Sequence, residues 1–118
     1  MLRLRARILR ARVDFRAVEE PTMRMMMRVQ IPTEAGNEAI KKGTLPDVIR
    51  KTLESLKPEA AYFTTMDGHR TMIVVFDMSA ASDMPRLAEP MFMAMNAKID
   101  FMPCMNADDL RSGLAAIK

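Results

Sequence analysis

The residue types that carry most enzyme chemistry are scarce in this 118-residue chain, which has one histidine and one cysteine. His69 directly follows Asp67-Gly68, a typical hairpin turn, so we expect its imidazole to be solvated. A metal or haem site needs inward His, Cys or clustered carboxylates. We therefore expect no metal and no cofactor, and both haem degradation and an Asp–His pair are disfavoured. The four glycines form no phosphate-binding loop and no dinucleotide fingerprint.

Two further features near the C-terminus are better interpreted as structural. Cys104 needs a neighbouring base or a helix N-terminus to become a nucleophile, and we interpret it as a small buried thiol. Asp108 and Asp109 follow Asn106, a candidate helix cap, and carboxylates in a first turn complement the helix dipole. No catalytic residue is assigned from these motifs.

Arg28, Tyr62 and Asp100 are the candidate ligand-binding residues, and each falls on a predicted strand. Tyr62 offers a hydroxyl in one register of its strand, whereas Phe63 takes its place in the other. A methionine-rich apolar cavity with one Arg, one Asp and one Tyr suits a flat organic anion or a quinone-like molecule. The alternative is that Arg28 and Asp100 form a structural ion pair inside a dimer interface.

The whole net charge of +3 lies in the first 22 residues, where six arginines outnumber three carboxylates. From residue 23 onward, twelve basic residues balance twelve acidic ones. A nucleic-acid-binding domain normally carries a basic patch within its fold, so we expect no nucleic acid partner. No run of 18 apolar residues exists, so we expect no membrane partner. A lone cysteine makes no internal disulfide, and we expect a cytoplasmic protein.

Residues 1–22 form a basic leader whose composition differs from the rest. It is arginine-rich like a targeting peptide, but it lacks serine and the unbroken apolar core of a secretory signal. Leu2, Leu9 and Val13 recur near helical spacing, as in an amphipathic arm, yet arginine surrounds the helical wheel. We expect a poorly ordered extension, or translated sequence upstream of a true start at Met23.

Residues 23–118 read as one α+β domain in the order β-α-β-β-α-β-α, with the first helix in two pieces. The predicted strands cover residues 23–31, 59–66, 70–78 and 97–105, and the predicted helices cover residues 33–42, 44–57, 82–95 and 106–117. Thr33, Thr44, Ser82 and Asn106 are the candidate helix caps. Pro90 is expected to kink its helix or to cost about 3 kcal/mol, with Glu89 beside it facing solvent or the rim of a pocket.

This order predicts a ferredoxin-like fold with an antiparallel sheet of strand order 4-1-3-2. Both long helices then cover one face of the sheet and leave the other bare. The third strand presents an apolar set in either register, Met72, Val74 and Phe76 or Thr71, Ile73 and Val75. Because such a face cannot stay in water, we expect a homodimer in which two open faces close into one barrel.

The segments IPTEAGNEAIKKGTLPDVIRKTLESLKPEAAYFTTMDGHR and LAEPMFMAMNAKIDFMPCMNADDL carry a resemblance to a known group. The chain resembles short bacterial proteins of uncharacterised function with the fold of the dimeric α/β-barrel superfamily. The similarity runs from Met23 to about Leu114, and KPEAAYFT, the Asp67-Gly68 hairpin and AEP-x-F-x-x-x-N-A-K carry it. The resemblance implies the fold but no single function, because the superfamily includes monooxygenases, isomerases, haem-degrading enzymes and ligand-sensing domains.

Two classes of function fit these residues. The first is a dimeric module that binds a small molecule or a partner without turnover. The second is a cofactor-independent monooxygenase or isomerase, in which Arg28 holds an anionic substrate and Asp100 or Tyr62 moves a proton. We favour the first, because without an inward histidine the proton transfer falls to a carboxylate; the residues do not decide whether the protein is an enzyme.

The leader is predicted to be dispensable for folding and assembly, because its composition departs from the domain and Pro21 separates the two. A chain that starts at Met23 should keep the melting temperature and the oligomeric state of the full chain. Differential scanning calorimetry and light scattering measure both. A loss of several degrees on truncation would contradict the prediction.

Overall fold

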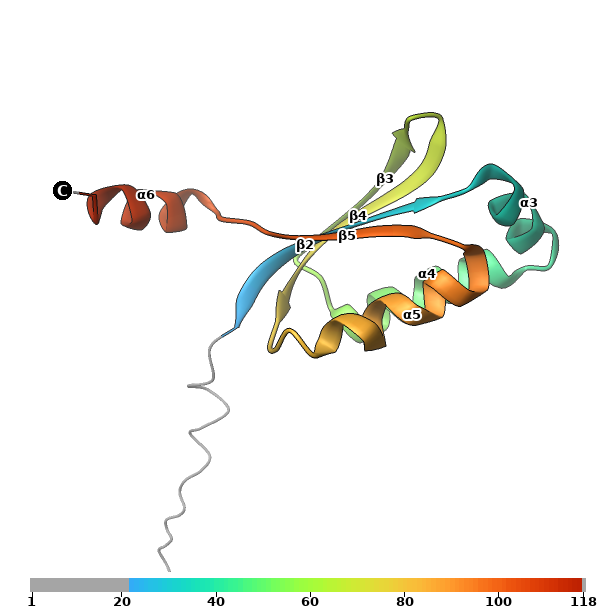
Figure 1. The fold of residues 1–118 in the computed structure, drawn as a ribbon, viewed down its shortest axis with the longest axis horizontal. Helices are drawn as coiled ribbons and strands as arrows, with labels where there is room; N and C mark the ends of the chain where they lie inside the picture. The colour runs from blue at the N-terminus through green and yellow to red at the C-terminus, as the bar shows by residue number, and fades with distance from the viewer. Residues whose placement is uncertain (1–21, 118) are drawn as a thin grey trace, which may run out of the picture.

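The computed structural model describes residues 22–117, which form a four-stranded sheet and four helices (Figure 1). The strands are β2 (Met23–Ile31), β3 (Ala60–Met66), β4 (His69–Met78) and β5 (Lys98–Pro103), and the helices are α3 (Thr33–Lys41), α4 (Thr44–Leu56), α5 (Asp83–Met95) and α6 (Ala107–Ala115). The predicted α+β class and element order are confirmed. The leader lies outside the described residues, apart from Thr22. Within residues 22–117 no helix has the length and apolar character needed to cross a bilayer.

The first strand of the domain, β2, lies in the middle of the sheet, and all strand pairs are antiparallel. The order across the sheet is β3-β4-β2-β5, which is 2-3-1-4 when the strands are numbered along the chain from the β3 edge. The order 4-1-3-2 written from the sequence describes the same neighbours from the β5 edge.

Asp67 and Gly68 both have positive φ, 54° and 76°, as a two-residue type I′ hairpin requires. Pro103 ends the edge strand β5, where its missing N–H is tolerated.

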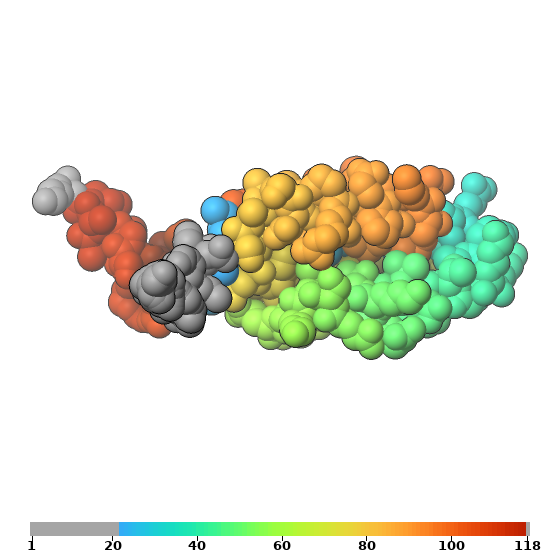
Figure 2. All heavy atoms as spheres, turned by 90° about the horizontal axis from the view of Figure 1, so that it is seen from below, coloured from blue at the N-terminus to red at the C-terminus, as the bar shows by residue number. Residues whose placement is uncertain are grey.

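Helices α4 and α5 lie side by side on one face of the sheet and cover a core rich in methionine (Figures 1 and 2). The buried strand residues of this core are Met25, Met27, Val29, Ile31, Met72, Val74, Phe76 and Met78. The α5 helix adds Leu87, Met91 and Met95, and α4 packs against them with Leu45, Val48, Leu53 and Leu56. Of the two registers left open for β4, the structure has the one in which Val74 faces the helices and Ile73 faces away.

Helix capping follows the sequence prediction only at α6. Asn106 Oδ1 accepts a hydrogen bond from the Asp109 backbone N–H at 2.8 Å, and Asp109 Oδ2 accepts one from the Asn106 N–H at 3.1 Å. The predicted caps of the other three helices make no capping hydrogen bond. Thr44 instead donates its hydroxyl to the carbonyl of Ala39 at 3.2 Å, because the short connection after α3 brings the end of that helix within reach.

The face assignment of β4 predicts opposite outcomes for two neighbouring charge substitutions. Val74 is fully buried, so Val74→Asp places an unpaired carboxylate in the core at a cost of about 3–5 kcal/mol, against a total stability of roughly 5–15 kcal/mol for a small domain. We expect Val74→Asp to lose its cooperative thermal transition in circular dichroism. Ile73→Asp, the matched control on the other face, should keep a folded spectrum. The reverse result, with folding kept in Val74→Asp and lost in Ile73→Asp, would show that the faces are assigned wrongly.

Candidate functional site

The face of the sheet opposite α4 and α5, called the open face below, carries the candidate ligand-binding residues. Its complete cross-strand rows are Ala60-Val75-Met26-Met102, Tyr62-Ile73-Arg28-Asp100 and Thr64-Thr71-Gln30-Lys98. Residues directly opposite on paired strands project to the same side. The structure therefore brings Arg28, Tyr62 and Asp100 into one row and places Phe63 on the helix side. Among the described residues, no helix covers this face (Figure 1).

The Arg28 guanidinium is the central charged group of the open face. Its Nη2 donates to Asp100 Oδ2 at 2.7 Å, and its Nη1 lies 3.9 Å from the sulfur of Met66. The side chains of Arg28 and Asp100 are 36% and 44% exposed. The Nε atom of Arg28 is buried and has no hydrogen-bond partner among the described residues. Because buried donors are usually satisfied, the ion pair alone does not account for this arginine.

Tyr62 lies at the other end of the same row, and the residue is 69% exposed. Two strand spacings separate its backbone from that of Arg28, about 10 Å at the usual distance between neighbouring strands. Half-buried Ile73 lies between them on β4. Across the sheet, the row thus presents a charged group, an apolar side chain and an aromatic ring, in that order. This arrangement suits one face of a flat molecule with an anionic end.

A small polar pocket of about 140 Å³ lies at the hairpin end of the open face and was missed from the sequence. Its lining residues are Gln30, Pro32, Asp67, His69 and Lys98. Buried Gln30 donates through Nε2 to the carbonyl of Met66 at 3.2 Å, and that nitrogen lies 3.4 Å from Asp67 Oδ2. His69, predicted to be solvated, is partly exposed and lines this pocket. The alternation of side chains along a strand could have placed His69 on this face, because it is four residues from Ile73 and residues an even number apart project to the same side.

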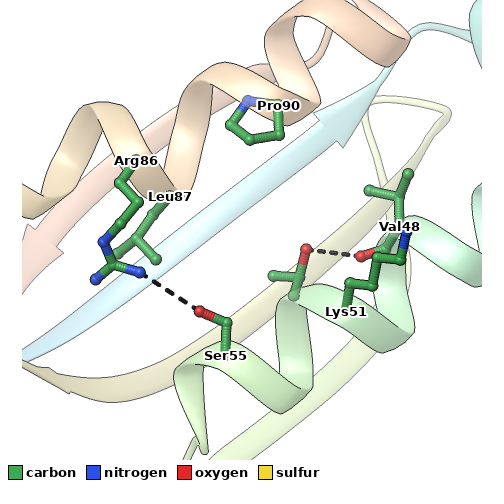
Figure 3. Close-up of a pocket in the computed structure, with 7 residues that line it drawn as sticks. Val48, Lys51, Ser55, Arg86, Leu87 and Pro90 are labelled. Carbon is green, nitrogen blue, oxygen red and sulfur yellow. Dashed lines mark hydrogen bonds between the residues drawn. The ribbon is translucent and has the colours of Figure 1, made fainter.

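Two cavities of more than twice this volume lie away from this row. The first, of about 390 Å³, is a groove between α4 and α5 lined by Val48, Lys51, Thr52, Ser55, Arg86, Leu87 and Pro90 (Figure 3). Arg86 Nη1 donates to Ser55 Oγ across it at 3.5 Å. The α5 helix continues through Pro90, which lines the groove, whereas exposed Glu89 is not among the lining residues. The second cavity, of about 380 Å³, is largely apolar and lies where β2 and α5 begin.

A cluster of charges at the end of the sheet joins β2, α6 and the segment before β3. Arg24 Nε donates to Glu59 Oε1 at 2.8 Å, and Arg24 Nη1 donates to Asp109 Oδ2 at 2.7 Å. The pKa of Arg24 is raised above its usual value, mainly by the hydrogen bond to Glu59, with the charges of Glu59, Asp109 and Asp77 adding to it. Cys104 is half-buried beside this cluster, and its backbone N–H donates to the Arg24 carbonyl at 3.1 Å.

No group of three His, Cys, Asp or Glu residues able to hold a metal occurs in the part of the chain that the structure describes.

Comparison with known proteins returned no match to a protein-family model, to a curated protein or to a solved structure.

The Arg28–Asp100 pair predicts that the costs of the two single substitutions do not add in the double variant. Asp100→Asn leaves a partly buried charge without its counter-ion, and Arg28→Met does the same to the carboxylate; each should cost about 1 kcal/mol of unfolding free energy at this half-exposed site. The double variant Arg28→Met with Asp100→Leu removes both charges and the unpartnered Nε, and should recover most of that loss. Urea denaturation at one fixed protein concentration measures all three. Costs that simply add would contradict the coupling.

Proposed function

We propose that the protein is a homodimer of the dimeric α/β-barrel type and that it binds a small organic anion between its two open faces. One observation carries the proposal: an arginine with a buried, unpartnered Nε sits in the middle of a sheet face that no described helix covers. The row from Arg28 to Tyr62 then forms one wall of the binding site, and the second copy supplies the other wall.

The composition of the open face favours self-association. Met26, Ile73, Val75 and Met102 occupy its centre, and all four keep part of their surface exposed in the single chain. Covering an apolar side chain of this size is worth up to about 1.5–3 kcal/mol, and less where part is already buried. The neutral Arg28–Asp100 pair adds no net charge between two-fold related copies. A symmetric dimer therefore buries the same apolar surface from both sides.

The ligand class follows from the groups along the row. Arg28 offers a charge-assisted donor to a carboxylate or an enolate oxygen, and Tyr62 offers a ring face and a hydroxyl. Asp100 holds the guanidinium in place through its 2.7 Å contact, which makes it a positioning residue rather than a free base. Binding without turnover accounts for this arrangement, because the carboxylate of the row is already engaged.

One observation supports the alternative of a cofactor-independent monooxygenase or isomerase. His69 lines the polar pocket in the row beyond Thr71, so the open face has an imidazole able to move a proton. In that case His69 is the acid–base group and Arg28 holds the substrate anion. Turnover of quinols or lactones that disappears in His69→Gln would support this alternative over simple binding.

The assembly and the site are tested together with 4-hydroxybenzoate as the probe, an aromatic carboxylate of the expected class. Light scattering should show a dimer for the unmutated chain at micromolar concentration, and Ile73→Asp should be a folded monomer. Calorimetric titration should detect binding to the dimer and none to Ile73→Asp. Arg28→Met should weaken binding about tenfold or more, because a charge-assisted hydrogen bond is worth about 1.5–3 kcal/mol.

The controls separate the open face from the rest of the surface. Thr65→Asp changes an exposed residue of β3 on the other side of the sheet and should leave the dimer intact. Arg50→Met removes an exposed arginine of α4 and should leave the affinity unchanged. A stable monomer of the unmutated chain would overturn the dimer, and equal affinity in Arg28→Met would overturn the site.

A further inference from the structure

The last helix, α6, stands apart from the rest of the domain. It follows β5 through an extended segment, residues 104–106, and projects past the end of the sheet (Figures 1 and 2). None of its residues is buried. Leu110 and Leu114 of α6 are 47% and 57% exposed, and Ile117, two residues past the end of the helix, is 72% exposed. The Ile117 N–H donates to the carbonyl of Leu114 at 3.1 Å, so the turn after α6 keeps the three residues on about the same side. The stripe formed by these three residues has no packing partner among the described residues.

A helix of this length needs such a partner. Isolated helices shorter than about 12–15 residues are marginal in water, and α6 has nine residues. Gly113 in its interior lowers its intrinsic stability further. The Asn106 capping box favours the first turn but buries no apolar surface. None of the residues 22–117 supplies the apolar surface that would stabilise α6.

The start of α6 is fixed on the open-face side of the sheet. Arg24 alternates with Met25 on β2 and so shares its side with Arg28. Its guanidinium holds Asp109, in the first turn of α6, and Glu59, just before β3. These two ion pairs place the beginning of α6 next to the rim of the open face. The exposed stripe therefore begins next to the edge of the surface on which the proposed dimer forms.

The size of the open face also points to a second copy of the chain as the packing partner of the stripe. Its three complete rows of four residues and two partial rows, Arg24-Asp77 and Met66-His69, give 12 plus 4, or 16 residues. A stable protein interface uses about 20–30 residues on each side. The sheet alone therefore falls short of that size. The α6 stripe, together with exposed Met105 in the preceding segment, supplies apolar surface to make up the difference.

We infer that α6 is an exchanged arm, and that the stripe of Leu110, Leu114 and Ile117 packs against a second copy of this chain. The contact is reciprocal, so one two-fold axis satisfies both arms at once. This inference rests on the open-face dimer of the proposed function and adds a second, separable part to its interface.

Hydrogen exchange of the full chain tests the arm directly. The α6 amides should exchange about tenfold or more slowly in the dimer than in the folded monomer Ile73→Asp. Leu110→Glu combined with Leu114→Glu should raise the dimer dissociation constant about tenfold or more, measured by sedimentation. Ser112→Glu adds a single carboxylate on the opposite side of α6 and should change the dissociation constant less than about twofold, whereas Leu114→Glu alone, with the same added charge in the stripe, should change it more.

Each contrary result identifies which part fails. A dimer whose α6 amides exchange as fast as those of Ile73→Asp would overturn the arm and leave the open-face dimer standing. Slow α6 exchange in the Ile73→Asp monomer would also overturn the arm, because α6 would then pack on its own chain. An unmutated chain that is monomeric at micromolar concentration would overturn the dimer and the arm together.

Discussion

The pairing of β2 with β4 along all nine residues of β2 is the constraint on which the rest of the structure depends. Side chains alternate along a strand, so this one register decides what both faces contain. It turns Met25, Met27 and Val29 toward α4 and α5, and it turns Arg28 and Gln30 the other way. A slip by one residue would bury the guanidinium under the helices and expose the methionines. The core and the candidate site are therefore two results of the same hydrogen-bonded ladder.

The same register leaves two unsatisfied surfaces in a single chain, the open face and the stripe of α6. Side chains of β2 contact both surfaces. Arg28 lies in the middle of the open face, and Arg24 forms an ion pair with α6 at the edge of that face. The proposed ligand site, the proposed dimer and the inferred arm are linked for this reason: in each of them a second copy would remove the same kind of surface from water. A central strand that carries arginines on one side only makes that linkage possible.

Much of the fold was predictable because its signals are local. The period-two pattern of residues 23–31, the Asp67-Gly68 turn and the Asn106 cap each depend on a few neighbouring residues, and the structure has all three. Arg28 and Asp100 could be proposed as neighbours once the strand order was written. The choice between Tyr62 and Phe63 needed the pairing with Ile73, which no local pattern contains. The pocket beside His69 could not be predicted, because its lining residues Gln30 and Lys98 lie on β2 and β5, which are distant from His69 in sequence. Thr44 failed as a cap because the end of α3 competes for its hydroxyl.

The prominence of methionine in the core has a consequence for the thermodynamics of folding. Six of the buried core residues, Met25, Met27, Met72, Met78, Met91 and Met95, have unbranched thioether side chains. Ordering such a chain costs about 1.5–2 kcal/mol in rotamer entropy, against about 0.5–1 kcal/mol for leucine or isoleucine. The layer between sheet and helices therefore gives up more entropy than an aliphatic core of equal area. In return, its side chains can adjust to small shifts of α4 and α5, so that the proposed docking of a second copy on the opposite face need not leave voids in this core.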